Sequence, residues 1–171
     1  MRLICAIFAV VLALLASGCA GYKLGPSNGL TAGARSVQVG FFENKTLEPR
    51  LIESVAQALR KRFQEDGTYR LNTSGDGDII VTGVITKYER SGLTFLPGDV
   101  QTPRDFGIAM VASVTAVERA TGKKLLDKKE VAGRTTVRVG SDLVSAERQA
   151  LPLLTADLAY NIASLLVDGT W

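Results

Sequence analysis

The residue best suited to covalent chemistry is Cys19, which follows the small residues Ser17 and Gly18 near the start of the chain. A cysteine thiolate is a nucleophile, and its sulfur is a site of lipid attachment in many membrane-bound proteins. The sequence contains no histidine. Zinc sites that need imidazole, histidine-based triads and histidine general bases are therefore excluded within the chain.

The segment before Cys19 has the character of an export signal. Arg2 is followed by fourteen residues that carry neither charge nor a polar hydroxyl or amide group, and small residues come next. A basic start, a short apolar run and a small-residue cleavage site are typical of a secretory signal peptide. Because a cysteine directly after small residues resembles a bacterial lipobox, we predict that residues 1–18 are a lipoprotein signal peptide. An ordinary signal peptide cut nearby, leaving a free thiol, is the alternative.

Lipobox processing would diacylate the sulfur of Cys19 and remove Cys5, so that no internal disulfide could form. Acyl chains (palmitate, for example) would tether the protein to a membrane, since each buried methylene contributes about 0.8 kcal/mol. Residues 19–35 are punctuated by Gly, Pro, Ser and Asn, which indicates an acylated cysteine followed by a tether. We expect one folded domain over residues 36–171.

The motifs that could support catalysis or bind a metal are all incomplete. Asp76-Gly77-Asp78 could begin a calcium loop, but the next ligand positions would fall on Ile80 and Lys87. Gly122-Lys123 lacks the remaining residues of a phosphate-binding loop, and no S-x-x-K motif occurs. We therefore predict that the protein is not an enzyme and needs no metal or cofactor.

Basic residues gather in one segment of a nearly neutral chain. The whole sequence has 20 Lys+Arg against 17 Asp+Glu, a balance that does not indicate a nucleic-acid partner. Between residues 119 and 138, in contrast, basic residues greatly outnumber Asp127 and Glu130. The plain interpretation is a solvated strand edge whose lysines discourage aggregation. The alternative is a contact surface for an anionic lipid or an acidic partner, formed by Lys123, Lys124, Lys128 and Lys129.

Hydrophobic periodicity predicts the elements of the first half of the domain. Apolar residues alternate from Ser36 as in a strand, and Ile52, Val55, Leu59 and Phe63 follow at helical spacing. The predicted elements are a strand from Ser36, a helix over Pro49–Glu65 ended by Asp66-Gly67, a short strand over Tyr69–Asn72, a turn at 74–78 and a strand over Ile79–Tyr88.

The second half is predicted in the same way. Gly92, Pro97, Gly98 and Pro103 predict a long loop over residues 89–105. The remaining elements are a strand over Phe106–Ala116, a turn at Thr121-Gly122, a strand over Lys124–Val139 and a helix over Leu143–Val167, kinked or broken at Pro152. The sequence therefore predicts an α+β domain in the order β-α-β-β-β-(β)-α. Two helices would pack on one face of a mostly antiparallel sheet of four or five strands.

The order of these motifs resembles the LptE family of LPS-assembly lipoproteins, over essentially the whole mature chain. The motifs that carry the resemblance are the lipobox followed by Gly21-Tyr22-Lys23-Leu24, the strand ending in Phe41-Phe42-Glu43-Asn44-Lys45-Thr46, Pro49 before an amphipathic helix, Val81-Thr82-Gly83-Val84-Ile85, the hairpin turn at Thr121-Gly122-Lys123 and a final helix near Trp171.

The resemblance implies two helices on a four-stranded sheet and a lipid-anchored place in the outer membrane, facing the periplasm. Ala20, which follows Cys19 where an inner-membrane lipoprotein often has Asp, favours the same location. Members of the family sit inside a large outer-membrane β-barrel partner (an LptD-like protein). They plug it, assist its assembly and help pass lipopolysaccharide to the outer leaflet.

Two other classes of function compete with this interpretation. Segments similar to Phe42–Thr46 occur in regulatory envelope lipoproteins that dock on peptidoglycan synthases and in subunits of secretion channels. A regulator that crosses the periplasm needs a long tether, whereas residues 20–35 reach at most about 55 Å when extended. An envelope hydrolase is the third class, and the sequence offers it no catalytic site.

Overall fold

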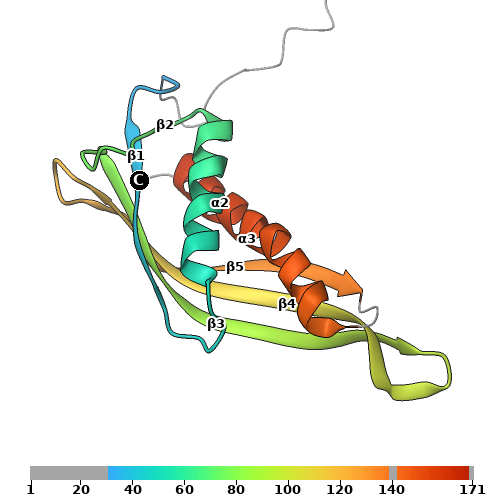
Figure 1. Cartoon of the computed structure of the whole chain (residues 1–171). Helices are drawn as coiled ribbons and strands as arrows, with labels where there is room; N and C mark the ends of the chain where they lie inside the picture. Colours follow the sequence, from blue (N-terminus) through green and yellow to red (C-terminus); the bar gives the residue numbers. More distant parts are fainter. Residues whose placement is uncertain (1–30, 139–141, 170–171) are drawn as a thin grey trace, which may run out of the picture.

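The computed structural model describes residues 31–138 and 142–169, so Cys19 and the predicted signal peptide lie outside the described residues. Seven elements follow one another in the predicted order (Figure 1). They are β1 (Ser36–Asn44), α2 (Leu51–Asp66), β2 (Arg70–Leu71), β3 (Ile79–Leu96), β4 (Asp99–Glu118), β5 (Lys124–Arg138) and α3 (Leu143–Asp168).

The strands form one curled sheet in the order β2-β1-β3-β4-β5. β1 pairs in parallel with both β2 and β3, whereas β3, β4 and β5 form an antiparallel meander. The sheet is therefore mixed, because α2 returns the chain so that β2, and after it β3, run parallel to β1 on its two sides. Both helices lie on the same face of the sheet (Figure 1). The α+β class and the element order are confirmed.

The helix α2 begins and ends at identifiable residues. The prediction that Pro49 lies in its first turn was wrong, because Arg50 has a φ of 64° and the helix starts at Leu51. Gly67 adopts a φ of 72° and donates its N–H to the carbonyl of Phe63, which closes the C-terminal end. Between these ends, one face of the helix is buried through Leu51, Val55, Ala56, Leu59 and Phe63.

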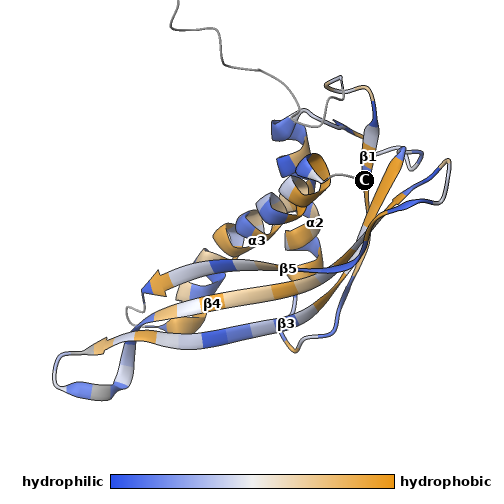
Figure 2. Ribbon diagram, turned by 180° about the vertical axis from the view of Figure 1, so that it is seen from behind, coloured by the Kyte–Doolittle hydropathy of each residue, from blue (hydrophilic) through white to orange (hydrophobic). Residues whose placement is uncertain are grey.

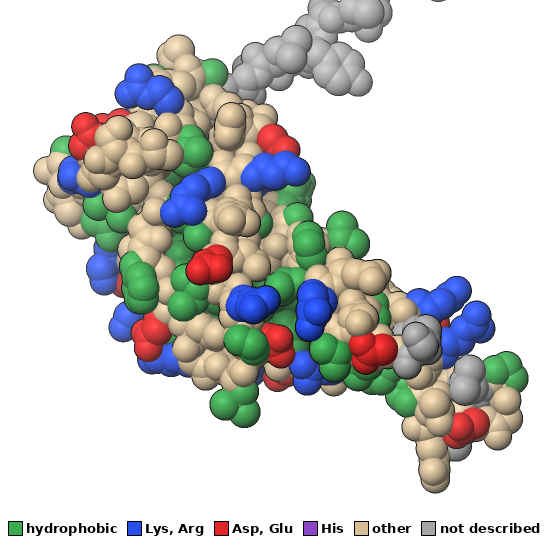
Figure 3. All heavy atoms as spheres, viewed as in Figure 1, with side chains coloured by type: hydrophobic (Ala, Val, Ile, Leu, Met, Phe, Trp, Pro, Cys, Tyr) green, Lys and Arg blue, Asp and Glu red, His purple; other side chains and the backbone are tan. Residues whose placement is uncertain are grey.

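The prediction of a long loop over residues 89–105 was wrong. β3 and β4 stay paired to Leu96 and Asp99, and they turn at Pro97-Gly98, where Gly98 has a φ of 82°. Register shifts between Gly92 and Leu96 break the alternation that would have revealed these strands. Because β5 ends opposite Asp105, β4 has a free edge beyond that point, where a proline such as Pro103 is tolerated. The hairpin projects past the helices as an arm (Figures 1 and 3).

The helix α3 is continuous through Pro152, so the alternative of a break there was wrong. The hydroxyl of Thr155 donates to the carbonyls of Leu151 and Pro152, in the turn that the proline perturbs. By length and hydropathy alone α3 could span a membrane, but half of its apolar window is buried inside the domain. We therefore interpret it as a core helix.

The backbone of α3 rests directly on β5. A Cβ atom placed on Gly133 would lie 2.7 Å from the amide nitrogen of Leu158 and 2.8 Å from the carbonyl oxygen of Leu154. Only glycine allows so close an approach of a helix to a strand. On either side of this contact, Asp157 accepts from the N–H of Arg134, and Asn161 donates to the carbonyl of Ala132. Two side chains of α3 thus satisfy backbone groups of an edge strand.

The core lies between the helices and the inner face of the sheet. Alternate residues of β3 and β4 point to this side and are buried, including Val81, Ile85, Met110 and Val114. The buried stripe of α3 packs against them through Leu154, Leu158, Ile162 and Leu166. Hydrophilic and hydrophobic bands accordingly alternate along the long strands (Figure 2).

Gly133→Leu is expected to lower the free energy of unfolding by about 1–3 kcal/mol, because the new side chain would push α3 away from β5. The corresponding loss in melting temperature is about 2–4 °C for each kcal/mol, measured by circular dichroism on the purified protein. Arg134→Leu, at the exposed neighbouring position, is the matched control. Equal melting temperatures for Gly133→Leu and the wild type would contradict the close contact.

Candidate functional site

The outer face of the sheet, opposite the helices, is not covered by any described element. Because the residues at 81 and 85 point into the core, Thr82, Val84 and Thr86 point outward from β3. Side chains of β1 and β4 lie beside them, and together they form a shallow hollow of about 530 Å³. Its lining residues are Phe41, Glu43, Lys45, Thr82, Gly83, Val84, Thr86, Ser113, Thr115 and Lys128.

Phe41 and Phe42 point to opposite faces of the sheet. Phe42 is 1% exposed and its ring fills the space over Gly83, where a side chain would collide with it. Phe41 is 73% exposed on the outer face. An aromatic ring left in water at the edge of a polar hollow is the kind of residue that anchors a protein–protein contact.

The hydrogen bonds of the loop after Phe42 stabilise the loop itself. The side-chain oxygen of Asn44 accepts from both the N–H and the hydroxyl of Thr46, and its amide donates to the carbonyl of Glu48. This Asx turn leaves Leu47 fully exposed at its tip. The segment therefore forms a hydrogen-bonded loop with an exposed apolar side chain at its tip.

Arg90 ties three segments together at one end of the domain. Its guanidinium pairs with Glu48 at 3.1 Å and with Glu147 at the start of α3, and it lies 5.3 Å from the centre of the Tyr88 ring. The bond to Glu147 raises the pKa of Arg90, and burial raises the pKa of the Tyr88 hydroxyl. Sequence reasoning missed this cluster because its members are far apart in the chain.

All four predicted contact lysines are exposed, but the structure separates them. Lys128 lies at a bulge with a φ of 48°, donates its N–H to the Thr115 hydroxyl and lines the outer hollow. Lys129 pairs in register with Val114, whose side chain is in the core. Lys129 therefore belongs to the inner face of the sheet, opposite the face that carries the hollow. Lys124 forms an ion pair with Asp127 at 2.9 Å. Of the four lysines, only Lys128 lines the hollow.

The acidic turn at 74–78 is engaged in internal bonds. Asp76 accepts from Asn72, and Asp78 accepts from both the N–H and the hydroxyl of Ser36. These hydrogen bonds from Ser36 hold the pKa of Asp78 below its ordinary value. Among residues 31–138 and 142–169, no group of three potential metal ligands comes together.

The comparisons with known proteins decide the family. The sequence matches the family model described as "LptE: Lipopolysaccharide-assembly" over residues 34–168, which is nearly the whole described domain. The chain belongs to the LptE family. A search of curated sequences found no match. LptE proteins are lipoproteins without enzymatic activity, so this chain is an envelope lipoprotein of lipopolysaccharide assembly.

Solved structures share the fold at low identity. Hypothetical protein CT253 from Chlamydia trachomatis has a TM-score of 0.56 at 10% identity, covering 78% of this chain and 96% of that one. Protein XCC0632 from Xanthomonas campestris has a TM-score of 0.55 at 8% identity, covering 85% and 91%. A minor lipoprotein from Acinetobacter baumannii has a TM-score of 0.50 at 10% identity, covering 78% and 94%. At these identities the likeness concerns the fold alone.

The Ser36–Asp78 bonds predict an acid sensitivity. Because the pKa of Asp78 is lower in the folded state, its contribution is present above its ordinary pKa near 3.8 and is lost progressively as the pH falls from there through the lower pKa of the folded state. Asp78→Asn should lower the melting temperature at pH 7 and flatten its decline between about pH 5 and 2.5. Asp76→Asn, in the same turn, should keep the wild-type decline. A wild-type pH profile in Asp78→Asn would refute the assignment.

Proposed function

We propose that this protein is an outer-membrane lipoprotein subunit of a lipopolysaccharide transport complex, which plugs and assists a large β-barrel (LptD-like) partner. The observation that carries the proposal is the family match, which runs from residue 34 to residue 168. Three features of the chain support it: a lipid-anchoring cysteine, a short connection to the domain and an uncovered sheet face.

The anchor is Cys19, through which acyl chains would hold the protein at the periplasmic side of the outer membrane. The chain is bound to the folded domain from Gly33 onward, since the N–H of Gly33 donates to the carbonyl of Thr68 and Arg35 forms an ion pair with Glu118. Residues 20–32 would span at most about 45 Å when fully extended. This length keeps the domain beside the membrane in which the partner is embedded.

The outer face of the sheet is the surface that best suits the inner wall of a barrel. It combines the exposed ring of Phe41 with a row of hydroxyl-bearing residues, namely Thr82, Thr86, Ser113 and Thr115. Aromatic anchors surrounded by polar groups are typical of protein–protein interfaces. The opposite face is already used by α2 and α3.

Lys128 places a positive charge in this surface. In the proposed complex it faces lipopolysaccharide phosphates or acidic residues of the barrel lining, with Lys123, Lys124 and Lys129 at the neighbouring hairpin end. Such exposed charges act over the Debye length of about 8–10 Å near physiological salt, so this contribution weakens as salt is added.

Lipid attachment is tested by labelling cells with a palmitate analogue. The wild-type chain should incorporate the label and fractionate with the outer membrane, whereas Cys19→Ala should lose the label because no other cysteine follows it. Undiminished labelling of Cys19→Ala would rule out this anchor. Cys5→Ala, inside the predicted signal peptide, is the matched control and should be labelled as the wild type is.

The barrel partner is tested by isolating the tagged full-length protein from membranes in mild detergent, followed by mass spectrometry. A large β-barrel should be recovered with the wild type, and Phe41→Glu should reduce its recovery about tenfold, as expected for an aromatic anchor. Arg60→Glu, on the solvent side of α2, should leave recovery unchanged.

Two results would count against the barrel proposal. Recovery of a peptidoglycan synthase or a secretion channel, without a barrel, would favour the other classes of lipoprotein. Equal recovery of the barrel with wild type and Phe41→Glu would show that the outer face is not the contact. Exposed substitutions of this kind usually change stability by less than about 0.5 kcal/mol, so the variants should remain folded.

A further inference from the structure

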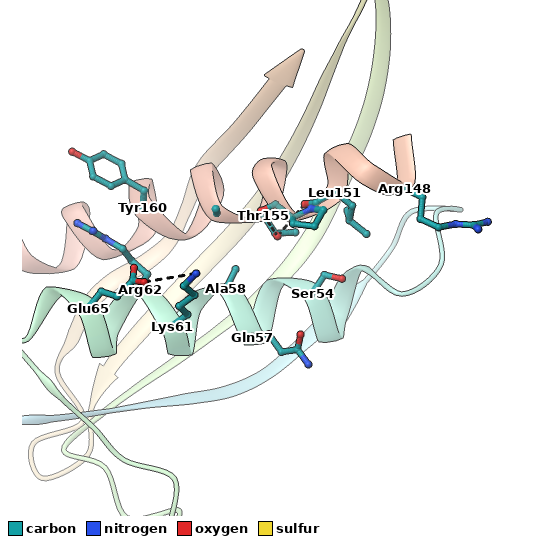
Figure 4. A pocket seen from close by; sticks show the side chains of 12 residues that line it. Ser54, Gln57, Ala58, Lys61, Arg62, Glu65, Arg148, Leu151, Thr155 and Tyr160 are labelled. Carbon is teal, nitrogen blue, oxygen red and sulfur yellow. Dashed lines mark hydrogen bonds and ion pairs between the residues drawn. The ribbon is translucent and has the colours of Figure 1, made fainter. Parts of the chain in front are cut away.

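A groove runs between α2 and α3 on the side of the helices that faces away from the sheet. It exists because small residues meet there, with Ala58 on α2 facing Thr155 and Ala156 on α3. The groove has a volume of about 490 Å³, and Leu151 and Pro152 extend its apolar floor (Figure 4). Hydrophobic, basic and acidic side chains are interspersed on this face of the molecule (Figure 3).

An unusual arginine stands at one end of the groove. The guanidinium of Arg62 lies 4.7 Å from the centre of the Tyr160 ring and 3.4 Å from the carboxylate of Asp66. Its Nε atom is buried, and it finds no hydrogen-bond partner among the described residues. A buried donor without an acceptor costs free energy, so an acceptor supplied by a ligand would be favoured there. Figure 4 shows Arg62 rising between the helices toward Tyr160.

The charges around the groove favour an anion. Three cationic side chains line the groove, namely Lys61, Arg62 and Arg148. Against them stand the carboxylate of Glu65 in the lining and that of Asp66, which pairs with Arg62. Lys61 and Glu65 form only a long pair of 3.8 Å on the exposed rim. Guanidinium groups bind phosphate through charge-assisted hydrogen bonds, which are stronger than neutral ones.

The size and polarity of the groove fit a lipid chain better than a folded partner. A volume of about 490 Å³ is that of a small-molecule site, whereas a partner helix would need a wider apolar trough. The apolar floor of Ala58, Pro152 and Ala156 continues from the charged end along the helices. The groove therefore offers an anion site joined to an apolar channel.

We propose that the groove between α2 and α3 binds one acyl chain and the adjoining phosphate of a lipopolysaccharide molecule. The phosphate accepts from Arg62 beside Lys61, and the acyl chain lies over Ala58 and Ala156. This inference rests on the proposed function for the identity of the lipid, but it concerns the helical face, opposite the outer face of the sheet. The protein would then hold lipopolysaccharide on the side that the sheet does not present to the barrel.

The test uses the full-length chain in growing cells, with a photoreactive benzophenone amino acid at Gln57 on the exposed rim of the groove. After irradiation in cells labelled with radioactive phosphate, a labelled adduct with the mobility of lipopolysaccharide is expected. Arg62→Gln should reduce its yield about tenfold, because a charged hydrogen-bond donor is lost. Ala156→Phe, which fills the apolar floor and keeps the charges, should reduce it as well.

Controls separate this proposal from its premise. The same photoreactive residue at Arg60, on the solvent side of α2, should give little adduct, and Lys87→Gln, at an exposed position of β3, should leave the Gln57 adduct unchanged. A phospholipid-sized or protein-sized adduct at Gln57, or none at all, would overturn the groove proposal. If the barrel is still recovered with the protein in that case, the proposed function stands and only the groove assignment fails.

Discussion

The contact between Gly133 and the backbone of α3 is the constraint on which the rest of the architecture depends. Because nothing but a hydrogen stands between strand and helix there, α3 is held at a fixed height over the edge of the sheet. Asp157 and Asn161 then bind the backbone of β5 on both sides of the glycine. The position of α3 in turn sets where α2 can lie, and therefore the width of the groove between them.

This arrangement gives the sheet two unlike faces. One is filled by the helices and forms the core, while the other carries Phe41 and the hydroxyl groups of β3 and β4. The loop organised by Asn44 adds a further exposed apolar side chain, Leu47. In such a domain, the helix-covered face of the sheet supplies the stability, and the uncovered face is free to contact a partner.

The sequence predicts most of the fold because periodicity reports burial, and burial dominates here. The helical spacing of Val55, Leu59 and Phe63 and the unbroken alternation of β4 from Phe106 correspond to residues in the core or packed near it. The arm formed by the ends of β3 and β4 was not predicted, since few of its residues are buried and register shifts interrupt its two-residue alternation. Glycine and proline there mark a tight turn and a free edge, not a loop.

The candidate surfaces were harder to predict because they depend on tertiary placement. Four lysines close in sequence lie on different faces, since a bulge at Lys128 changes the direction of the side chains after it. Arg62 and Tyr160 come from helices that are far apart in the chain, and no short motif announces their contact. Arg90 meets Glu48 and Glu147 for the same reason only in the folded domain.

The parallel pairing of β1 with β3 has a consequence for how a nascent chain reaches this fold. β1 and α2 are synthesised before β3 exists, so their apolar residues have no sheet to cover until the meander has formed. The antiparallel strands β3, β4 and β5 are joined by short turns and can assemble locally, whereas closing the parallel pair requires a long crossover. α3, which is synthesised after the meander, is also the element that packs on Gly133. Completion of the core therefore waits for α3, and a chain that stops short of it leaves both the core and the edge of β5 open to other chains.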